Sequence, residues 1–276
     1  MIERKKLIRW ISLAAYFAAA FLVFLLVLFP FDRVKSRIES EVRARTSLEL
    51  GIARISPRFF NRFLLTDVVV SDKDGKVLFE SPAMKVHLPL FGLLRGLTSV
   101  NLSGRAYGGD LSLRTEQGAK RRFLSVDANG LDLGSYTLFK VMGIKLSGKT
   151  GGTFEMTNDD GKARLWVKNL ASRELKIKGF PVPDLDFEQG WIEADLKGDR
   201  LTVKKLDLEG KELKIRVSGD LVLRERGSLN LAFKIKPSER LAKEQALLIA
   251  FLKNKDAEGF YQFSLGGTVA EPLPRL

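Results

Sequence analysis

The chain has 276 residues, of which 45% are apolar and 29% are charged, so it is neither a polytopic membrane protein nor a disordered chain. It contains no cysteine and one histidine, His87, which excludes disulfides, thiolate metal sites and cysteine nucleophiles. The formal net charge of +13 favours anionic partners: lipid headgroups, acidic proteins or nucleic acid.

An apolar run without a charged residue extends from Trp10 to Phe31. As a helix it spans roughly 33 Å, about the thickness of a bilayer hydrocarbon core. No small-x-small cleavage site follows the run, so we predict a retained signal anchor over residues 10–31. The side chains expected in the membrane are Trp10, Ile11, Phe17, Phe21, Phe24, Leu28 and Phe31.

Basic residues flank this run on both sides, and we expect them to face lipid headgroups: Arg4, Lys5, Lys6, Arg9, Arg33, Lys35 and Arg37. The positive-inside rule places the short tail, residues 1–9, in the cytoplasm. Residues 47–276 are then expected in the periplasm of a bacterium with two membranes, behind a single-pass inner-membrane anchor. The absence of cysteine agrees with an oxidising compartment.

After the anchor, Val34, Ile38 and Val42 are spaced four residues apart among charged residues. This spacing predicts an amphipathic juxtamembrane helix over residues 32–46. Two interpretations stay open, a stalk and a helix that lies on the headgroups.

From Leu48 onward, apolar and polar residues alternate in short runs, the pattern of antiparallel strands with one buried and one wet face. Glycine-containing turn signals separate the runs at 197–199, 209–211, 218–220 and 226–228. This order predicts a meander of hairpins and argues against a doubly wound nucleotide-binding sheet.

Helical patterns return over residues 133–142 and 238–253, the second with Ser238 as its expected N-cap. Each of these helices is expected to cover the apolar side of the sheet, with a partner-docking face as the alternative. Four strand phrases are expected to end in a turn glycine: 100–104, 206–210, 215–219 and 263–267.

Residues 143–150, Gly-Ile-Lys-Leu-Ser-Gly-Lys-Thr, fit the phosphate-binding loop pattern G-x-x-x-x-G-K-T. That chemistry requires a loop that opens into a helix whose N-terminus faces the phosphates. Here Ile144-Lys145-Leu146 alternates like a strand, and Gly151-Gly152 follows. We therefore expect a strand and no nucleotide.

The remaining polar motifs predict structure and not chemistry. The acidic stretches at 72–75 and 158–161 end in Asp-Gly and are expected to be hairpin turns, not calcium loops. His87 has no second histidine or cysteine beside it and is expected to be a packed or half-exposed strand residue. At Lys120-Arg121-Arg122, nucleic-acid binding would need interleaved aromatic residues and a compartment that contains nucleic acid, and the predicted anchor argues against both. We therefore expect anionic headgroups, an acidic partner or solvent there, and no nucleic acid.

Two stretches together resemble a known family. One runs from Ile55-Ser-Pro57 through Phe63–Val70 and Leu93-Leu-Arg-Gly96 to Val100–Gly109, and the other is the ending, Gly259–Pro272. With a single N-terminal span and a β-rich body, the chain resembles the type II secretion system protein N family. It is also similar to the wider AsmA-like group, whose members begin with the same kind of anchor and opening block.

The resemblance implies a non-enzymatic, inner-membrane-anchored periplasmic component of type II secretion, with other secretion components as partners and no cofactor. The AsmA-like group implies, as the alternative, a lipid-binding or lipid-transfer protein with an apolar groove that takes phospholipid. The expected fold class is mainly β: a transmembrane helix, then a long, curled antiparallel sheet, an AsmA-like groove or a sandwich, with one or two short covering helices. No catalytic or metal residue follows from the resemblance.

Overall fold

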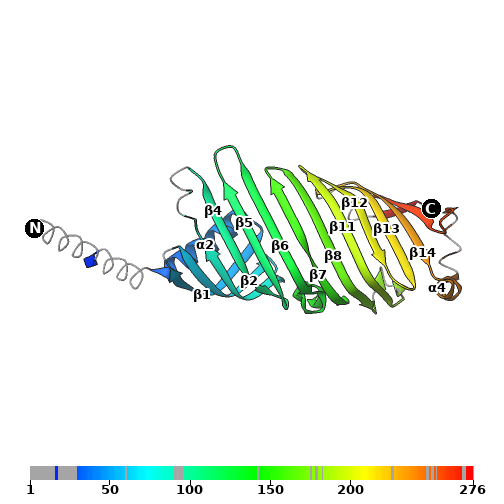
Figure 1. The fold of residues 1–276 in the computed structure, drawn as a ribbon, viewed down its shortest axis with the longest axis horizontal. Helices are drawn as coiled ribbons and strands as arrows, with labels where there is room; N and C mark the ends of the chain where they lie inside the picture. The colour runs from blue at the N-terminus through cyan, green and yellow to red at the C-terminus, as the bar shows by residue number, and fades with distance from the viewer. Residues whose placement is uncertain are drawn as a thin grey trace, which may run out of the picture.

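The computed structural model describes residues 16–17, 30–59, 61–89, 92, 96–141, 143–174, 176–177, 180–181, 183–224, 227–246, 249, 252, 254–268 and 272–275. Within these residues the protein is mainly β, as predicted, and one long sheet forms the body of the molecule (Figure 1). Most of the expected anchor, residues 10–31, lies outside the described residues. None of the described helices is long and apolar enough to cross a bilayer.

The sheet begins at Leu48, where the sequence predicted the change of period. Its strands are β1 (Leu48–Phe59), β2 (Arg62–Asp72), β3 (Val77–His87), β4 (Thr98–Ala106), β5 (Gly109–Gln117), β6 (Arg122–Asp132), β7 (Lys145–Thr157), β8 (Asp160–Arg173), β11 (Leu185–Lys197), β12 (Arg200–Glu209), β13 (Leu213–Val222), β14 (Leu229–Pro237), β15 (Asn254–Lys255), β16 (Tyr261–Gly267) and β17 (Pro272–Arg275). A separate two-stranded pair, β9 (Lys176–Ile177) and β10 (Phe180–Pro181), lies between β8 and β11 in the chain.

Strands that follow one another in the chain pair with one another nearly throughout, so the sheet is an antiparallel meander. The order runs from β1 to β16, with β15 and β17 beside β16, and the two ends do not pair. The sheet is therefore open and has two edges. A second sheet that would turn it into a sandwich is not found in the part of the chain that the structure describes.

The sheet is curled along its length. Register shifts interrupt its ladders, for example between Ala128 and Leu131 and between Val203 and Leu206, and such bulges increase strand twist. The five-residue helix α3 (Thr137–Val141) contacts both β3 and β7. These strands lie four spacings apart, roughly 19 Å along the sheet, so a short helix touches both because the sheet bends between them.

Helices occur where the sequence predicted them. Residues 133–142 form a 3₁₀ turn, η2 (Leu133–Ser135), followed by α3. Ser238 caps α4 (Glu239–Glu244), and its hydroxyl oxygen accepts a hydrogen bond from the Leu241 N–H at 3.1 Å. The predicted continuation to residue 253 falls largely outside the described residues, and α4 itself ends at Glu244.

Two turn predictions were wrong. Gly219 was expected in a turn, but β13 runs through it, with φ +137° and an ideal Cβ only 2.2 Å from the Asn230 carbonyl oxygen. Gly104 likewise lies inside β4, where a Cβ would come within 2.5 Å of the Ala83 carbonyl oxygen. In both strands glycine permits a close backbone approach, and not a reversal of the chain.

Both edges of the sheet are protected against further strand pairing. At the first edge, α2 (Phe31–Arg45) lies beside β1: Glu39 Oε1 accepts the Ile52 N–H at 3.0 Å, and Lys35 Nζ donates to the Ala53 carbonyl at 3.5 Å. At the other edge, β17 contains two prolines, Pro272 and Pro274, which have no N–H to offer. The first edge is therefore occupied by side chains of α2, and the second lacks two backbone donors.

Candidate functional site

The inner face of the sheet carries two adjacent cross-strand rows that contain no polar side chain. Each row joins the residues that lie directly opposite one another on neighbouring strands, from β1 to β16. The second row lies two positions away from the first on most strands and is on the same face. The first row is Ile55, Leu65, Met84, Gly104, Leu111, Ala128, Gly152, Leu165, Ile192, Leu206, Val217, Phe233 and Phe263. The second row is Pro57, Phe63, Val86, Leu102, Leu113, Val126, Phe154, Ala163, Ala194, Val203, Gly219, Leu231 and Leu265.

A row beside the second one, on the outer face, is polar throughout. From β2 to β14 it reads Arg62, His87, Asn101, Arg114, Ser125, Glu155, Lys162, Asp195, Thr202, Asp220 and Asn230. Successive side chains of a strand point to opposite faces, so the register places the two apolar rows on one face of the sheet and this polar row on the other. We call the concave apolar face the trough.

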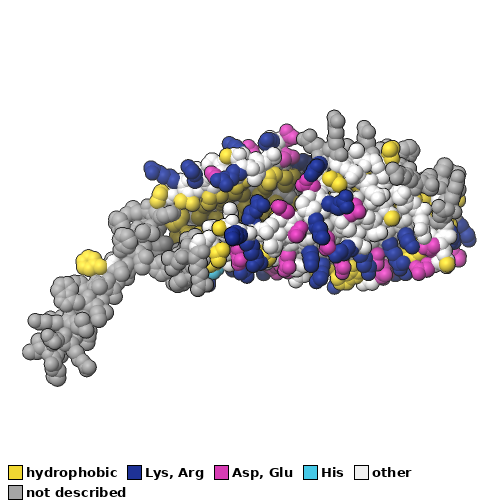
Figure 2. Space-filling model, turned by 90° about the horizontal axis from the view of Figure 1, so that it is seen from above, with side chains coloured by type: hydrophobic (Ala, Val, Ile, Leu, Met, Phe, Trp, Pro, Cys, Tyr) yellow, Lys and Arg dark blue, Asp and Glu magenta, His cyan; other side chains and the backbone are white. Residues whose placement is uncertain are grey.

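The trough is long and remains partly open. Thirteen strands at roughly 4.8 Å spacing make it roughly 58 Å long when followed along the sheet. Most side chains of its two rows are only half-buried, and Leu165 is 37% exposed. Hydrophobic side chains gather in a hollow between rims that carry charged residues (Figure 2). Soluble monomers rarely expose a continuous apolar surface of this extent.

At its N-terminal end the trough is covered by α2. Phe31, Val34 and Ile38 face strands β1–β4 across a cavity of about 440 Å³ whose lining is entirely apolar. The ring of Phe31 lies 6.3 Å from that of Phe63, centroid to centroid. The apolar stripe of residues 32–46 therefore packs against the sheet, a contact that neither the stalk nor the headgroup interpretation included.

A cluster of aromatic side chains lies where η2 and α3 meet the strand ends. Tyr107 contacts Phe79 and Tyr136, with ring centroids at 6.0 and 5.0 Å, and Phe139 follows at 5.1 Å from Tyr136. The Tyr107 hydroxyl oxygen accepts the Glu80 N–H at 2.9 Å, and burial raises the pKa of this hydroxyl above its ordinary value. The cluster holds α3 against β3.

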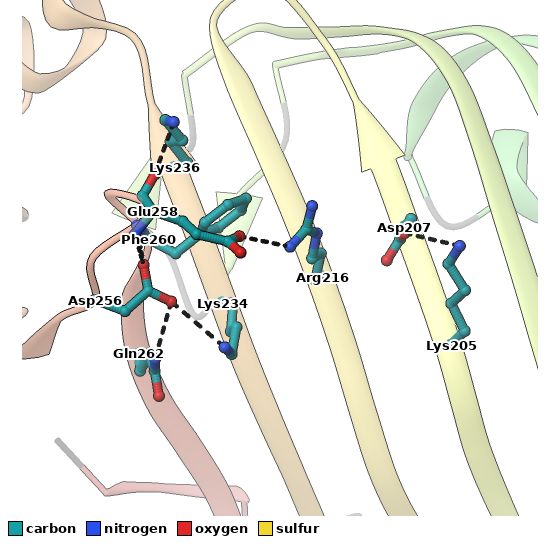
Figure 3. A network of polar contacts seen from close by, with 9 residues as sticks. All are labelled: Lys205, Asp207, Arg216, Lys234, Lys236, Asp256, Glu258, Phe260 and Gln262. Atoms are coloured by element: carbon teal, nitrogen blue, oxygen red, sulfur yellow. Dashed lines mark hydrogen bonds and ion pairs between the residues drawn. The ribbon is translucent and has the colours of Figure 1, made fainter.

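The outer face has a different character at each end. Over β12–β16 two of its cations meet carboxylates: Arg216 lies 3.2 Å from Glu258, and Lys234 lies 3.4 Å from Asp256 (Figure 3). Phe260, 3% exposed, lies under the Arg216 guanidinium at 4.5 Å. Asp256 also accepts the Phe260 N–H at 2.9 Å, and this bond lowers the pKa of the Asp256 carboxyl.

The polar motifs singled out in the sequence are structural. Residues 145–150 lie in β7, so the G-x-x-x-x-G-K-T match has the predicted strand geometry and not that of a loop before a helix. Residues 72–75 form a hairpin turn in which Asp72 Oδ1 accepts the Lys76 N–H at 2.8 Å. In the second stretch the turn is Asn158-Asp159, and Asp160-Gly161 already pair with β7 as the start of β8. His87 is half-buried in β3, 3.1 Å from Asn61 Nδ2. Within the described residues, no group of acidic or histidine side chains is placed to hold a metal ion.

The expected membrane residues are only partly visible. Arg4, Lys5, Lys6, Arg9, Trp10, Ile11, Phe21, Phe24 and Leu28 lie outside the described residues. Phe31 begins α2 and points to the sheet, while Arg33 and Arg37 are exposed on α2.

Sequence reasoning did not single out Arg58, Arg62 and Lys85. These cations come from separate strands and form no cluster in the sequence, and only the strand register brings them together.

Comparisons with protein-family models, with curated proteins and with solved structures found no match to this chain.

Proposed function

We propose that this protein binds the acyl chains of phospholipids in the trough and offers them a path along the sheet. The observation that carries the proposal is the pair of uninterrupted apolar rows from β1 to β16. Acyl chains need no hydrogen-bond partner, and each methylene removed from water contributes about 0.8 kcal/mol. Acyl chains can cover a half-exposed apolar face of this length. In a protein core, such a face would already be buried by other side chains.

The dimensions agree with a path and not with a single pocket. The trough is roughly 58 Å long, about twice the thickness of a bilayer hydrocarbon core. Its N-terminal end adjoins Phe31, the last residue of the segment expected in the membrane. A lipid leaving that bilayer would meet the strands β1–β4 first and the C-terminal strands last.

The experiment is site-specific photo-cross-linking in the full chain. A benzophenone amino acid is placed at Leu113, on the inner face of β5, and in a control variant at Asp110, which is exposed on the outer face of the same strand. The proposal expects covalent phospholipid adducts at Leu113 by mass spectrometry of protein from bacterial membranes, and several-fold fewer at Asp110. The same contrast is expected at Phe233 against Lys234 on β14.

Equal adduct yields at the inner and outer positions would contradict the proposal, because lipid would then be contacting both faces indifferently. Adducts at Leu113 without adducts at Phe233 would contradict the path, since lipid would then be confined to the end covered by α2. Both variants change one side chain in a strand whose partners remain, so each chain is compared with its own unirradiated sample.

A structural role in type II secretion, expected from the resemblance, stays a prediction of the sequence. It is tested by deleting the gene and measuring secretion of type II substrates, which should fall while envelope lipid composition is unchanged. The absence of enzymatic activity also stays a prediction, and a broad hydrolase screen of the purified chain tests it.

A further inference from the structure

A second groove lies on the outer face of β1–β5, on the opposite side of the sheet from the trough. Its volume is about 790 Å³. Arg58, Arg62, Lys85, His87 and Arg114 contribute to its lining, and no carboxylate does. Arg62 and His87 are directly opposite one another on β2 and β3, and Lys85 lies two positions before His87. We call this surface the basic groove.

Three of these cations have no acidic partner among the described residues. Arg58, Arg62 and Lys85 are exposed, and none takes part in an ion pair within the described structure. Arg114 differs, because it bonds the carboxylate of Glu116 on its own strand. A solvated surface normally intersperses both signs of charge, so three uncompensated cations around one hollow favour an anion from outside the protein.

The position of the basic groove points to the source of that anion. Phe63, next to Arg62 in β2, contacts Phe31, and Phe31 is where the apolar run of residues 10–31 joins the described fold. If that run spans the bilayer, as its sequence predicts, its end lies at the headgroup level. Arg62, Arg58 and Lys85 then lie close to the membrane surface, on the face of the sheet opposite the trough.

We propose that the basic groove docks on the phosphate groups of anionic lipid headgroups and holds the first strands of the sheet against the membrane. Arginine presents a planar fork of donors that matches phosphate oxygens, and lysine adds a point charge. Headgroup docking on the outer face leaves the inner face free. The proposal is therefore independent of what the trough carries and concerns how its N-terminal end is oriented toward the bilayer.

The experiment uses the full chain in lipid nanodiscs. Because the chain has no cysteine, Ser103→Cys places a single fluorophore in the basic groove, and Ser218→Cys places one on the outer face of β13 as the control site. Nanodiscs contain phosphatidylcholine alone or with about 30% phosphatidylglycerol, plus a headgroup-linked quencher. We expect quenching at residue 103 to rise about threefold or more with phosphatidylglycerol, to fall with added salt, and to stay unchanged at residue 218.

Charge-neutral variants identify the cations responsible. Arg62→Gln with Lys85→Gln should return quenching at residue 103 to the level of phosphatidylcholine alone. The matched pair Arg164→Gln with Lys214→Gln, exposed outer-face residues on β8 and β13, should leave it unchanged. Equal losses in the two pairs would overturn the proposal, because net charge and not the groove would then be responsible.

Two further results would also overturn it. One is equal quenching in neutral and anionic nanodiscs. The other is an identical response of the residue 103 fluorophore to inorganic phosphate in neutral nanodiscs, which would make the groove a site for free phosphate. Failure of the acyl-chain proposal is a separate outcome, since it is decided by adducts on the inner face.

Discussion

The two ends of the sheet share one architecture, yet they treat the charges on their outer faces in opposite ways. At the C-terminal end, Arg216 and Lys234 face the carboxylates of Glu258 and Asp256, which the turn before β16 brings over the neighbouring strands. At the N-terminal end, Arg58, Arg62 and Lys85 face none in the described structure. Arg216 and Lys234 therefore stabilise the fold through ion pairs, whereas Arg58, Arg62 and Lys85 can bind a partner outside the chain.

The inner faces differ in a complementary way. α2 lies over β1–β4 and leaves an apolar cavity of about 440 Å³ beneath it. Toward the C-terminal end the described helix α4 contacts β14, and the stacked rings of Phe233 and Phe263, 5.0 Å apart, remain half-buried. The N-terminal end is thus covered inside by α2 and has three cations outside that are unpaired within the described part of the chain, whereas at the C-terminal end Arg216 and Lys234 are paired outside.

The largest contrast in stability is expected between Phe260→Ala and Phe63→Ala. Phe260 is 3% exposed and supports the Arg216 side chain, so its loss should cost about 3 kcal/mol. Phe63 is half-buried beside an existing cavity, so its loss should cost about half as much. Urea unfolding of the full chain in detergent measures both, and equal costs would remove the distinction between the two ends.

A smaller effect is expected from glycine substitutions. Gly219→Ala should destabilise β13 by about 2 kcal/mol, because its φ of +137° and the nearby Asn230 carbonyl both oppose a Cβ. Gly51→Ala in β1 is the matched control: its Cβ would lie 3.9 Å from the nearest atom, the Val69 carbonyl oxygen, so we expect a change below about 0.5 kcal/mol. Urea unfolding measures both variants. A large loss of stability in Gly51→Ala would contradict the explanation that close backbone approach and positive φ make Gly219 necessary.

Neutralising single cations tests the central contrast directly. Arg216→Gln removes an ion pair and a cation–π contact and should cost about 1 kcal/mol, whereas Arg62→Gln should cost close to nothing. Thermal unfolding at low and high salt distinguishes them. A stability loss in Arg62→Gln equal to that in Arg216→Gln would show that Arg62 has a structural partner.

The smallest expected effect is a pH dependence at the C-terminal turn. The pKa of Asp256 is lowered, chiefly by the hydrogen bond from the Phe260 N–H, so its stabilisation is complete above the ordinary carboxyl pKa and is lost as pH falls through the lower native value. Hydrogen exchange of residues 256–262 should therefore show less protection in acid than exchange chemistry alone explains. Asp256→Asn should remove this additional loss of protection in acid. The N-terminal strands should not show a loss of protection that depends on Asp256.

Much of the fold was predictable because alternation is a local property of the sequence. The start of the strands at Leu48, the turn at residues 72–75 and the Ser238 cap all follow from residues within a few positions of one another. The strand nature of residues 145–150 was predictable for the same reason. Gly219 was misread because a glycine that permits close approach of a neighbouring strand looks the same, in one dimension, as a glycine that reverses the chain.

The sequence by itself determined that the body is β, that one strand face is apolar and that an apolar segment precedes it, because these depend on residue type and period. Tertiary structure alone decided that the sheet stays open, that Val34 and Ile38 pack on it, and that Arg58, Arg62 and Lys85 meet on one outer surface. The physical reason is that register and bulges, set by pairing between distant strands, determine which side chains become neighbours.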